Sequence, residues 1–273
     1  MNAAMQPDCV TDFTTDHYRS LLGRALGTGY RIVPFRDFAA VETHPVMILR
    51  HDLDHILEPA VTFAELEAAL GVRATYFVQT ACEFYNILAP AGRAIIRRLC
   101  DLGHEIGLHY VSQRYVGPDS RANLRSDIRL LEDLSGQRIV SAAQHIPIDG
   151  EFVSLAPEIR IEAYEPRYMA PPMGYISDSL MAWRQARPHD LVDQGKSFQF
   201  LTHPENWTES GGDIGTLLHR LMERDIRIVR ERYAATGAYY ESLLADRHRR
   251  DQAFRERRKD VGQPERMKSK PGS

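Results

Sequence analysis

The sequence lacks the features that define several large classes of proteins. Its three cysteines, Cys9, Cys82 and Cys100, are an odd number without a C-x-x-C spacing, which argues against a disulfide framework or a zinc ribbon. Nowhere do about 18 apolar residues run uninterrupted, so we predict no membrane span. The first ten residues have neither the basic nor the apolar region of a secretory signal, and we expect a cytoplasmic protein.

Two common catalytic signatures are also missing. The chain has no glycine-rich loop of the kind that holds phosphates and no G-x-S-x-G nucleophile elbow. What it does have is an ordinary globular composition, with 43% hydrophobic and 26% charged residues among 273. A chain of this length can bury a core that folds without disulfides or structural metals.

Charge is distributed unevenly along the chain. The net charge is -3, but residues 246–273 contain ten Lys or Arg and five Asp or Glu, which leaves -8 on residues 1–245. A basic tail can contact nucleic acid, yet this one lacks interleaved aromatic residues and ends in Lys-Ser-Lys-Pro-Gly-Ser. We therefore predict a single domain over residues 1–245, a flexible basic tail over 246–273, and no nucleic-acid partner.

Apolar periodicity and glycine stops predict alternating strands and helices. The predicted helices are Thr15–Leu26, Glu58–Leu70, Ala91–Leu102, Ser120–Leu134 and, as one long or two abutting helices, Asp213 to about Phe254. The predicted strands are Tyr30–Val33, Val46–Arg50, Ala74–Val78, Glu105–His109, Ile139–Ala143, Ile161–Tyr164, Tyr175–Ser177 and Ser197–Leu201. Such alternation is typical of parallel βα units, and about seven of them favour a complete or incomplete barrel.

Two aspartates follow one of the predicted buried strands. On an extended chain Arg50, Asp52 and Asp54 project to one face, while His51 and Leu53 project to the other. Neighbouring carboxylates repel each other unless a cation compensates. A divalent metal would supply that cation, with one aspartate as a ligand and the other free as a base; the alternative is a solvated turn.

Histidines occupy similar places after other strands. His109, His145 and His203 each lie at the carboxyl end of a predicted strand, and those ends converge at the mouth of a barrel. His104 lies on the opposite face of its strand from His109, so we predict a structural role for it. The histidines and the acidic pair are therefore predicted to share one site.

At these residues the sequence resembles the polysaccharide deacetylase superfamily (NodB homology, carbohydrate esterase family 4), and within it the divergent WbmS-like group found with O-antigen synthesis genes. The resemblance covers roughly Tyr18 to Trp207. The matching segments, in order, are Arg50–Asp54 in place of T-F-D-D-G, Ala74–Val78 for A-T-F-F-V, Gly103–His109 for G-H-E-I-G-x-H, His145–Pro147 in place of R-x-P, and Leu201–His203 for L-x-H.

The resemblance implies a fold and a set of roles. It implies a distorted (β/α)7 TIM-like barrel with an additional C-terminal helix, and a divalent cofactor, with zinc favoured. Asp52 would be the catalytic base, Asp54 and His109 metal ligands, and His203 the acid that protonates the leaving amine. Arg50 or His145 would hold the base. Tyr110 and Trp207 are candidate sugar-stacking surfaces, and ordinary packing in the core is the alternative for both.

The sequence also departs from the family pattern. Gln113 stands where a second metal-binding histidine is usual, so a third protein ligand is not evident unless His145 or another side chain supplies it. The implied activity is removal of an N-acetyl or similar acyl group from a sugar or nucleotide-sugar, in surface-polysaccharide (O-antigen, lipopolysaccharide) biosynthesis. The alternatives are a catalytically lapsed barrel that binds a sugar, and an amidohydrolase acting on a non-sugar amide.

Overall fold

The computed structural model describes residues 12–40, 45–146, 155–184 and 186–261. These residues form two compact units, one ending at Leu217 and the other starting at Leu218.

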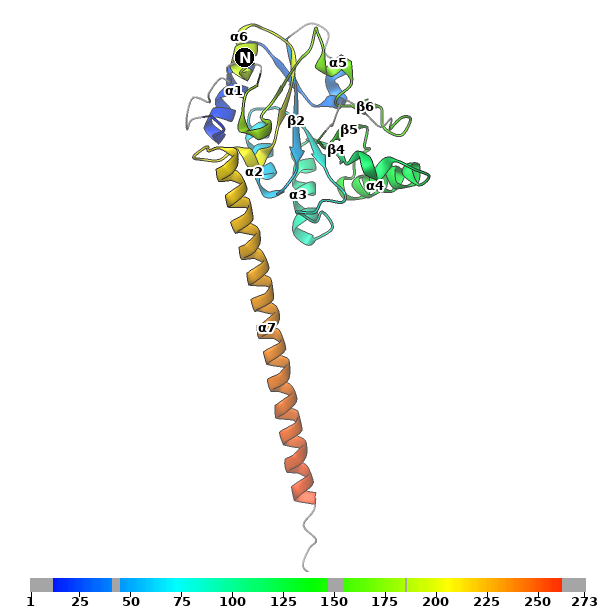
Figure 1. Cartoon of the computed structure of the whole chain (residues 1–273), viewed down its shortest axis with the longest axis vertical. Helices are drawn as coiled ribbons and strands as arrows, with labels where there is room; N and C mark the ends of the chain where they lie inside the picture. The colour runs from blue at the N-terminus through cyan, green and yellow to red at the C-terminus, as the bar shows by residue number, and fades with distance from the viewer. Residues whose placement is uncertain (1–11, 41–44, 147–154, 185, 262–273) are drawn as a thin grey trace, which may run out of the picture. The chain divides into compact units, whose positions relative to one another are not determined.

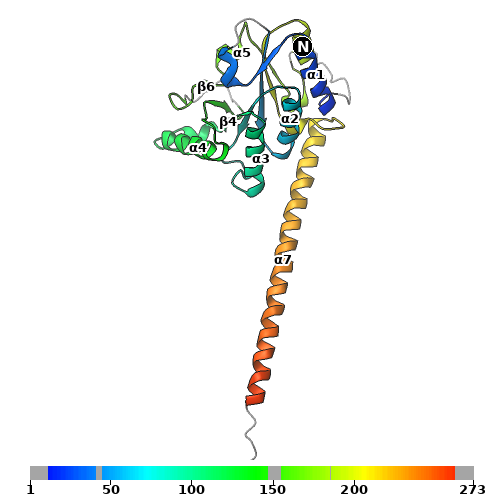
Figure 2. The same ribbon diagram turned by 180° about the vertical axis from the view of Figure 1, so that it is seen from behind.

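A curled parallel sheet forms the centre of the first unit (Figures 1 and 2). Its strands are β1 (Arg31–Val33), β2 (Val46–Leu53), β3 (Thr75–Val78), β4 (Glu105–Tyr110), β5 (Ser141–Gln144), β6 (Ile161–Glu162), β7 (Gly174–Ser177) and β8 (Phe198–Thr202). The order is β6-β5-β4-β3-β2-β8-β7, and β1 pairs with the first residues of β2. The predicted distorted (β/α)7 barrel is confirmed, and the described strands leave it open between β6 and β7.

Helices connect the strands and cover the outside of the sheet (Figure 1). They are α1 (Thr15–Gly27), α2 (Glu58–Ala69), α3 (Pro90–Asp101), α4 (Ser120–Ser135), α5 (Pro166–Met169) and α6 (Pro188–Asp193). A further helix, α7 (Ile214–Val261), follows the last strand. Short 3-10 helices lie at Phe35–Ala40, Ser112–Tyr115, Ser179–Met181 and Pro204–Asn206. Consecutive helices pack on each other, α2 on α3 and α3 on α4.

Strand β2 shows how the sequence positions the site. All eight of its residues are buried, and its side chains alternate between the barrel interior and the surrounding helices. On the interior face, Val46 and Ile48 join the apolar core with Phe77, and Arg50 and Asp52 follow toward the carboxyl end. The interior therefore changes from apolar to charged along one strand, and the charged end forms the mouth.

The predicted elements agree with the observed ones to within a few residues. The largest difference is at the end of α7, which runs to Val261 instead of about Phe254. Among the strands it is at β2, which extends three residues beyond the predicted Arg50 and so includes Asp52. Gly107 of β4 lies against the ring of Phe77. A Cβ at this position would lie 2.4 Å from the Phe77 ring, so the missing side chain makes room for Phe77 inside the barrel.

Helix α7 is one continuous helix of 48 residues. It includes Asp246 to Val261, part of the segment predicted as a flexible tail, while residues 262–273 lie outside the described chain. Beyond Leu221, no side chain of α7 whose exposure is described is buried. No helix among the described residues is both long and apolar enough to cross a membrane.

Candidate active site

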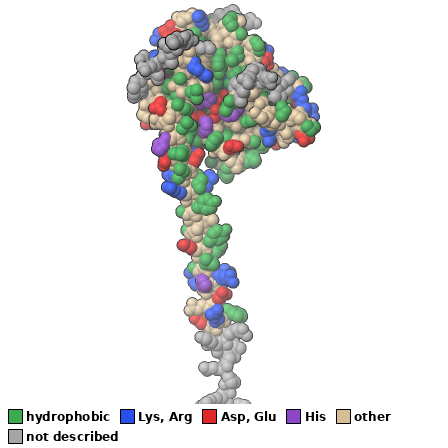
Figure 3. Space-filling model, viewed as in Figure 1, with side chains coloured by type: hydrophobic (Ala, Val, Ile, Leu, Met, Phe, Trp, Pro, Cys, Tyr) green, Lys and Arg blue, Asp and Glu red, His purple; other side chains and the backbone are tan. Residues whose placement is uncertain are grey.

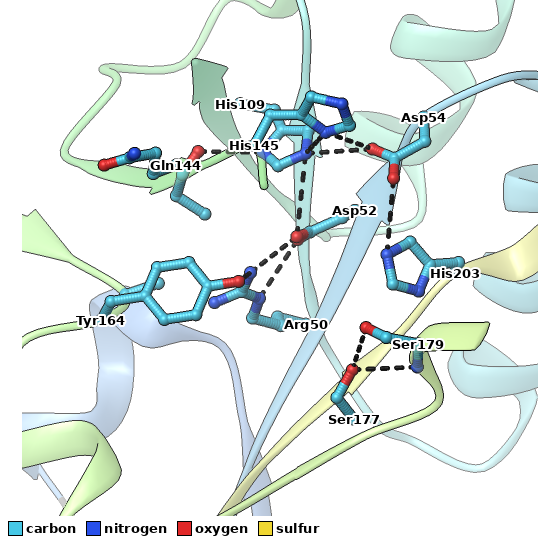
Figure 4. Close-up of polar contacts among 12 residues, drawn as sticks. Arg50, Asp52, Asp54, His109, Gln144, His145, Tyr164, Ser177, Ser179 and His203 are labelled. Atoms are coloured by element: carbon cyan, nitrogen blue, oxygen red, sulfur yellow. Dashed lines mark hydrogen bonds and ion pairs between the residues drawn. The ribbon is translucent and has the colours of Figure 1, made fainter. Parts of the chain in front are cut away.

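The carboxyl ends of the strands bring the predicted polar residues together (Figure 4). Asp52 lies near the end of β2 and Asp54 just after it, while His109 lies on β4. His145 and His203 directly follow β5 and β8. Parallel strands end at the same edge of a sheet, which is why residues up to 151 positions apart meet here.

Three side chains form a compact group of potential metal ligands. Asp54 Oδ1 lies 3.0 Å from His109 Nε2 and 3.3 Å from His145 Nδ1, and the two histidine nitrogens are 3.2 Å apart. All three residues are at least partly buried. The three atoms thus make a nearly equilateral triangle of one oxygen and two nitrogens.

The dimensions of this triangle fit a tetrahedral ion. Zinc–ligand bonds of about 2.0–2.2 Å place neighbouring ligands of a tetrahedron roughly 3.3–3.5 Å apart, close to the observed separations. Two histidines and one carboxylate are a common ligand set of catalytic zinc sites, in which the fourth position is left for water or substrate. The donor set therefore fits a divalent metal.

The protonation of His109 also favours a cation at this position. Its Nδ1 lies 2.9 Å from the Ala143 carbonyl oxygen, which fixes the proton on Nδ1 and turns the Nε2 lone pair toward Asp54. A lone pair and a carboxylate oxygen 3.0 Å apart repel each other unless a proton or a metal lies between them. Burial lowers the pKa of His109, but Asp52 and Asp54 outweigh burial and raise it overall.

Asp54 is strongly biased toward its charged form. Burial by itself would raise its pKa, yet the hydrogen bonds from His109 and His145 hold the pKa well below its usual value. Its second oxygen, Oδ2, faces His203 Nε2 at 3.5 Å. Asp54 thus connects the ligand group to the histidine on the other side of the mouth.

Asp52 is held by Arg50 from the same strand. The guanidinium donates to both carboxylate oxygens, at 3.1 Å from Nε and 2.6 Å from the terminal nitrogen, and both side chains are buried. Arg50 also donates to Gln199 and Tyr164, and its charge lies over the Tyr164 ring at 4.6 Å. A bidentate pair buried this deeply fixes the orientation of the carboxylate, whose Oδ2 lies 3.8 Å from His109 Nε2.

His203 is paired with an aspartate that we did not predict. Asp178 Oδ1 lies 2.6 Å from His203 Nδ1, and the Asp178 carboxylate also accepts the backbone N–H of His203. Burial lowers the pKa of His203, but Asp178 outweighs it, and together with Asp54 it holds this pKa well above the ordinary value. The raised pKa favours the protonated imidazole, whose Nε2 faces the mouth.

Sequence reasoning missed Asp178, Tyr164 and Gln199. Asp178 directly follows β7, so the strand-end rule that identified the histidines would also have identified it had it been applied to every acidic residue. Tyr164 lies two residues beyond the end of β6 and Gln199 lies inside β8. Neither carries a local signal, because each acts through a contact with Arg50 from a distant part of the chain.

The burial of the two candidate sugar-stacking residues favours the alternative, ordinary packing. Trp207 is 3% exposed, packs among Phe13, Tyr18 and Trp183, and donates its indole N–H to Asp178. Tyr110 is 1% exposed. Neither ring has a face open to a ligand, and Trp207 instead fixes the carboxylate that pairs with His203.

Other predicted positions take different places from those expected. His145 is one of the three grouped ligands, while Arg50 pairs with Asp52. Of the two candidates for orienting the base, the geometry therefore favours Arg50. Gln113 is exposed, on a 3-10 helix, and it is not one of the three grouped ligands. Pro147 of the His145–Pro147 match lies outside the described residues. His104 is buried and bonded to backbone atoms of Ala64 and Ala74, in keeping with a structural role.

No protein-family model matches the chain, and a search of curated proteins gives no match. Among solved structures it is similar to a deacetylase from Streptococcus pyogenes in complex with acetate (15% identity, 47% of this chain and 61% of that one, TM-score 0.40). It is also similar to a carbohydrate esterase family 4 pseudoenzyme from Bacillus anthracis (15%, 66% and 63%, TM-score 0.36). A third is a peptidoglycan deacetylase from Bacillus subtilis (16%, 70% and 99%, TM-score 0.37). The chain spans less than two thirds of the length of the first two.

Proposed function

We propose that the chain is a metal-dependent hydrolase that removes an N-acetyl or similar acyl group from a sugar. The observation that carries the proposal is that a proton acceptor and a proton donor both lie beside the three grouped ligands. The carboxylate of Asp52 is ion-paired with Arg50 on one side, and the cationic His203 lies on the other. Hydrolysis of an amide needs both a proton acceptor and a proton donor.

Asp52 would act as the general base. Its carboxylate removes a proton from the attacking water, and the two Arg50 contacts keep it in the orientation that this transfer needs. A divalent ion held by Asp54, His109 and His145 would supply a Lewis acid that activates water and polarises the acyl carbonyl.

His203 would act as the general acid. Its Nε2–H is positioned at the mouth, and Asp178 keeps the ring protonated near neutral pH. When the C–N bond breaks, His203 passes this proton to the departing amine nitrogen, and the acyl group leaves as its acid. Asp52 then releases to solvent the proton that it took from water, and the imidazole regains one from solvent.

The finer assignment rests on the matched motifs. They support zinc as the ion and a surface polysaccharide of the O-antigen type or its nucleotide-sugar precursor as the substrate.

Acetate release from a panel of N-acetylated sugars tests the proposal. Asp52→Asn should lower turnover at least about a hundredfold because the proton acceptor is lost, while zinc binding measured by calorimetry persists. His145→Ala should lose both zinc binding and turnover. Gln113→Ala, an exposed control, should change neither. Turnover that survives Asp52→Asn would refute the base assignment.

A further inference from the structure

Helix α7 carries a stripe of apolar side chains that its own chain leaves exposed. Met222, Ile226, Val229, Tyr233 and Tyr240 are between 38 and 76% exposed. Exposed single apolar residues are ordinary, but a continuous row of them on one helix marks a contact surface. Leu217 and Leu221, which are buried, lie on a different side of the helix at about 100° per residue.

The spacing of the stripe identifies the kind of surface. From Met222 the apolar positions follow at Ile226, Val229, Tyr233, Tyr240 and Leu243, in steps of four, three, four, seven and three residues. Thr236 divides the seven-residue step into three and four, and the resulting six steps average 3.5 residues, the repeat that keeps one seam of a helix facing a partner helix along its length. With Ile226, Tyr233 and Tyr240 at heptad position a, Met222, Val229, Thr236 and Leu243 occupy position d.

The flanking positions indicate a second copy of the same helix. Asp225 lies at position g and Arg230 at position e, and a parallel, in-register pair of helices brings g of one chain beside the following e of the other. The pair would thus form two Asp225–Arg230 contacts, one on each side of the seam. Within one chain Asp225 contacts the neighbouring Arg224, at a partly exposed site. Two heptads further along the helix, Tyr239 and Leu244 fill the equivalent g and e positions and widen the apolar seam.

The ends of the seam are also defined. The next a and d positions after Leu244 are Arg247 and Arg250, whose charges would meet their own copies across the interface. We therefore infer that residues 222–244 of α7 form a parallel two-stranded coiled coil with a second copy of the chain. This inference is independent of the hydrolase function.

Mass determination of the full chain by light scattering tests it first. The expected mass is that of two chains, and a single-chain mass at high concentration would overturn the proposal. Val229→Glu places a charge at a d position and should weaken the dimer at least about a hundredfold. Ala238→Glu at the outward f position, with the same new side chain on the same helix, should leave the dimer intact.

Charge reversal provides a test that does not disturb the seam. Asp225→Arg should weaken the dimer because it then faces Arg230, and adding Arg230→Asp should restore it. Failure of the double variant to restore the dimer would argue against the parallel register.

Cysteine cross-linking tests the orientation directly. In a background with Cys9, Cys82 and Cys100 replaced by serine, Val229→Cys should form an interchain disulfide, because a d residue faces its own copy in a parallel pair. Ala238→Cys should not. A dimer in which Val229→Cys fails to cross-link would be antiparallel, and the proposal would be wrong.

Discussion

The protonation of a single residue, His203, determines the pH range of the proposed reaction. Its pKa is raised because Asp178 outweighs the effect of burial. A group with a raised pKa keeps its proton below that pKa and loses it as pH rises through it. The acid should therefore fail only on the alkaline side of the pH profile.

Replacing the partner of His203 should move that limit. In Asp178→Asn the attraction is removed while burial remains, so the pKa of His203 falls. The alkaline limb of kcat against pH should shift to lower pH by at least about one unit. Glu209→Gln, at an exposed position nearby in sequence, is the control and should leave the profile unchanged. An unshifted limb in Asp178→Asn would remove His203 from the role of acid.

How much of the site the sequence predicts also becomes clear at single residues. Asp52, Asp54, His109, His145 and His203 were placed together because strand ends converge, which depends only on the order of strands and polar residues. The exposure of Trp207 could not be predicted in this way. Whether an aromatic ring next to the site faces ligand or core depends on packing partners such as Phe13, from the opposite end of the sequence.

Between elements, one buried glutamate connects the helices to the strands that carry the site. Glu67 of α2 accepts the hydroxyls of Tyr18 on α1 and Tyr76 on β3, at 2.6 and 2.9 Å. It also lies 2.7 Å from His51 Nε2, and His51 contacts Thr202 on β8. Because His51 precedes Asp52 and Thr202 precedes His203, this network lies directly behind the side chains of the proposed base and acid.

Removing Glu67 should destabilise the fold strongly. Glu67→Ala leaves two buried hydroxyls without an acceptor and should cost about 3–5 kcal/mol in urea unfolding. Glu65→Gln on the same helix breaks an exposed pair with Arg98 and should cost less than about 1 kcal/mol. Similar losses in the two variants would show that the network contributes little.

The same residue should make stability sensitive to acid. Burial raises the pKa of Glu67, but His51 outweighs it and the pKa is lowered overall from 4.5. Its contribution is therefore present above the unfolded-state pKa and is lost as pH falls toward the folded-state value. At neutral pH the unfolding free energy of the wild type should exceed that of Glu67→Gln. Below pH 4.5 the two values should converge, because the wild type loses more unfolding free energy than the variant.

The bounds of helices and strands were predictable where local signals were strong, as with the glycines at the ends of α1, α2, α3 and α4. The prediction for β2 stopped at Arg50 because a charged residue normally marks the end of a buried run. The strand continues because Asp52, Gln199 and Tyr164 satisfy that charge inside the barrel. Such compensation is a tertiary property that no local pattern contains.

At the scale of the whole molecule, metal binding should couple to unfolding. A ligand bound only by the folded state stabilises it by about 2.7 kcal/mol at a concentration one hundred times its dissociation constant. Zinc should therefore raise the unfolding temperature of wild type and of Gln113→Ala, but not of His145→Ala. An equal response in His145→Ala would place the ion elsewhere.

The lone pairs of the three ligand atoms converge on one space. A metal ion that binds there must therefore replace a proton. Without a metal, the raised pKa of His109 favours a proton between its Nε2 and Asp54. Metal uptake must then expel this proton into the buffer. Below that pKa, competition between the two cations should weaken apparent zinc affinity about tenfold for each pH unit of acidification.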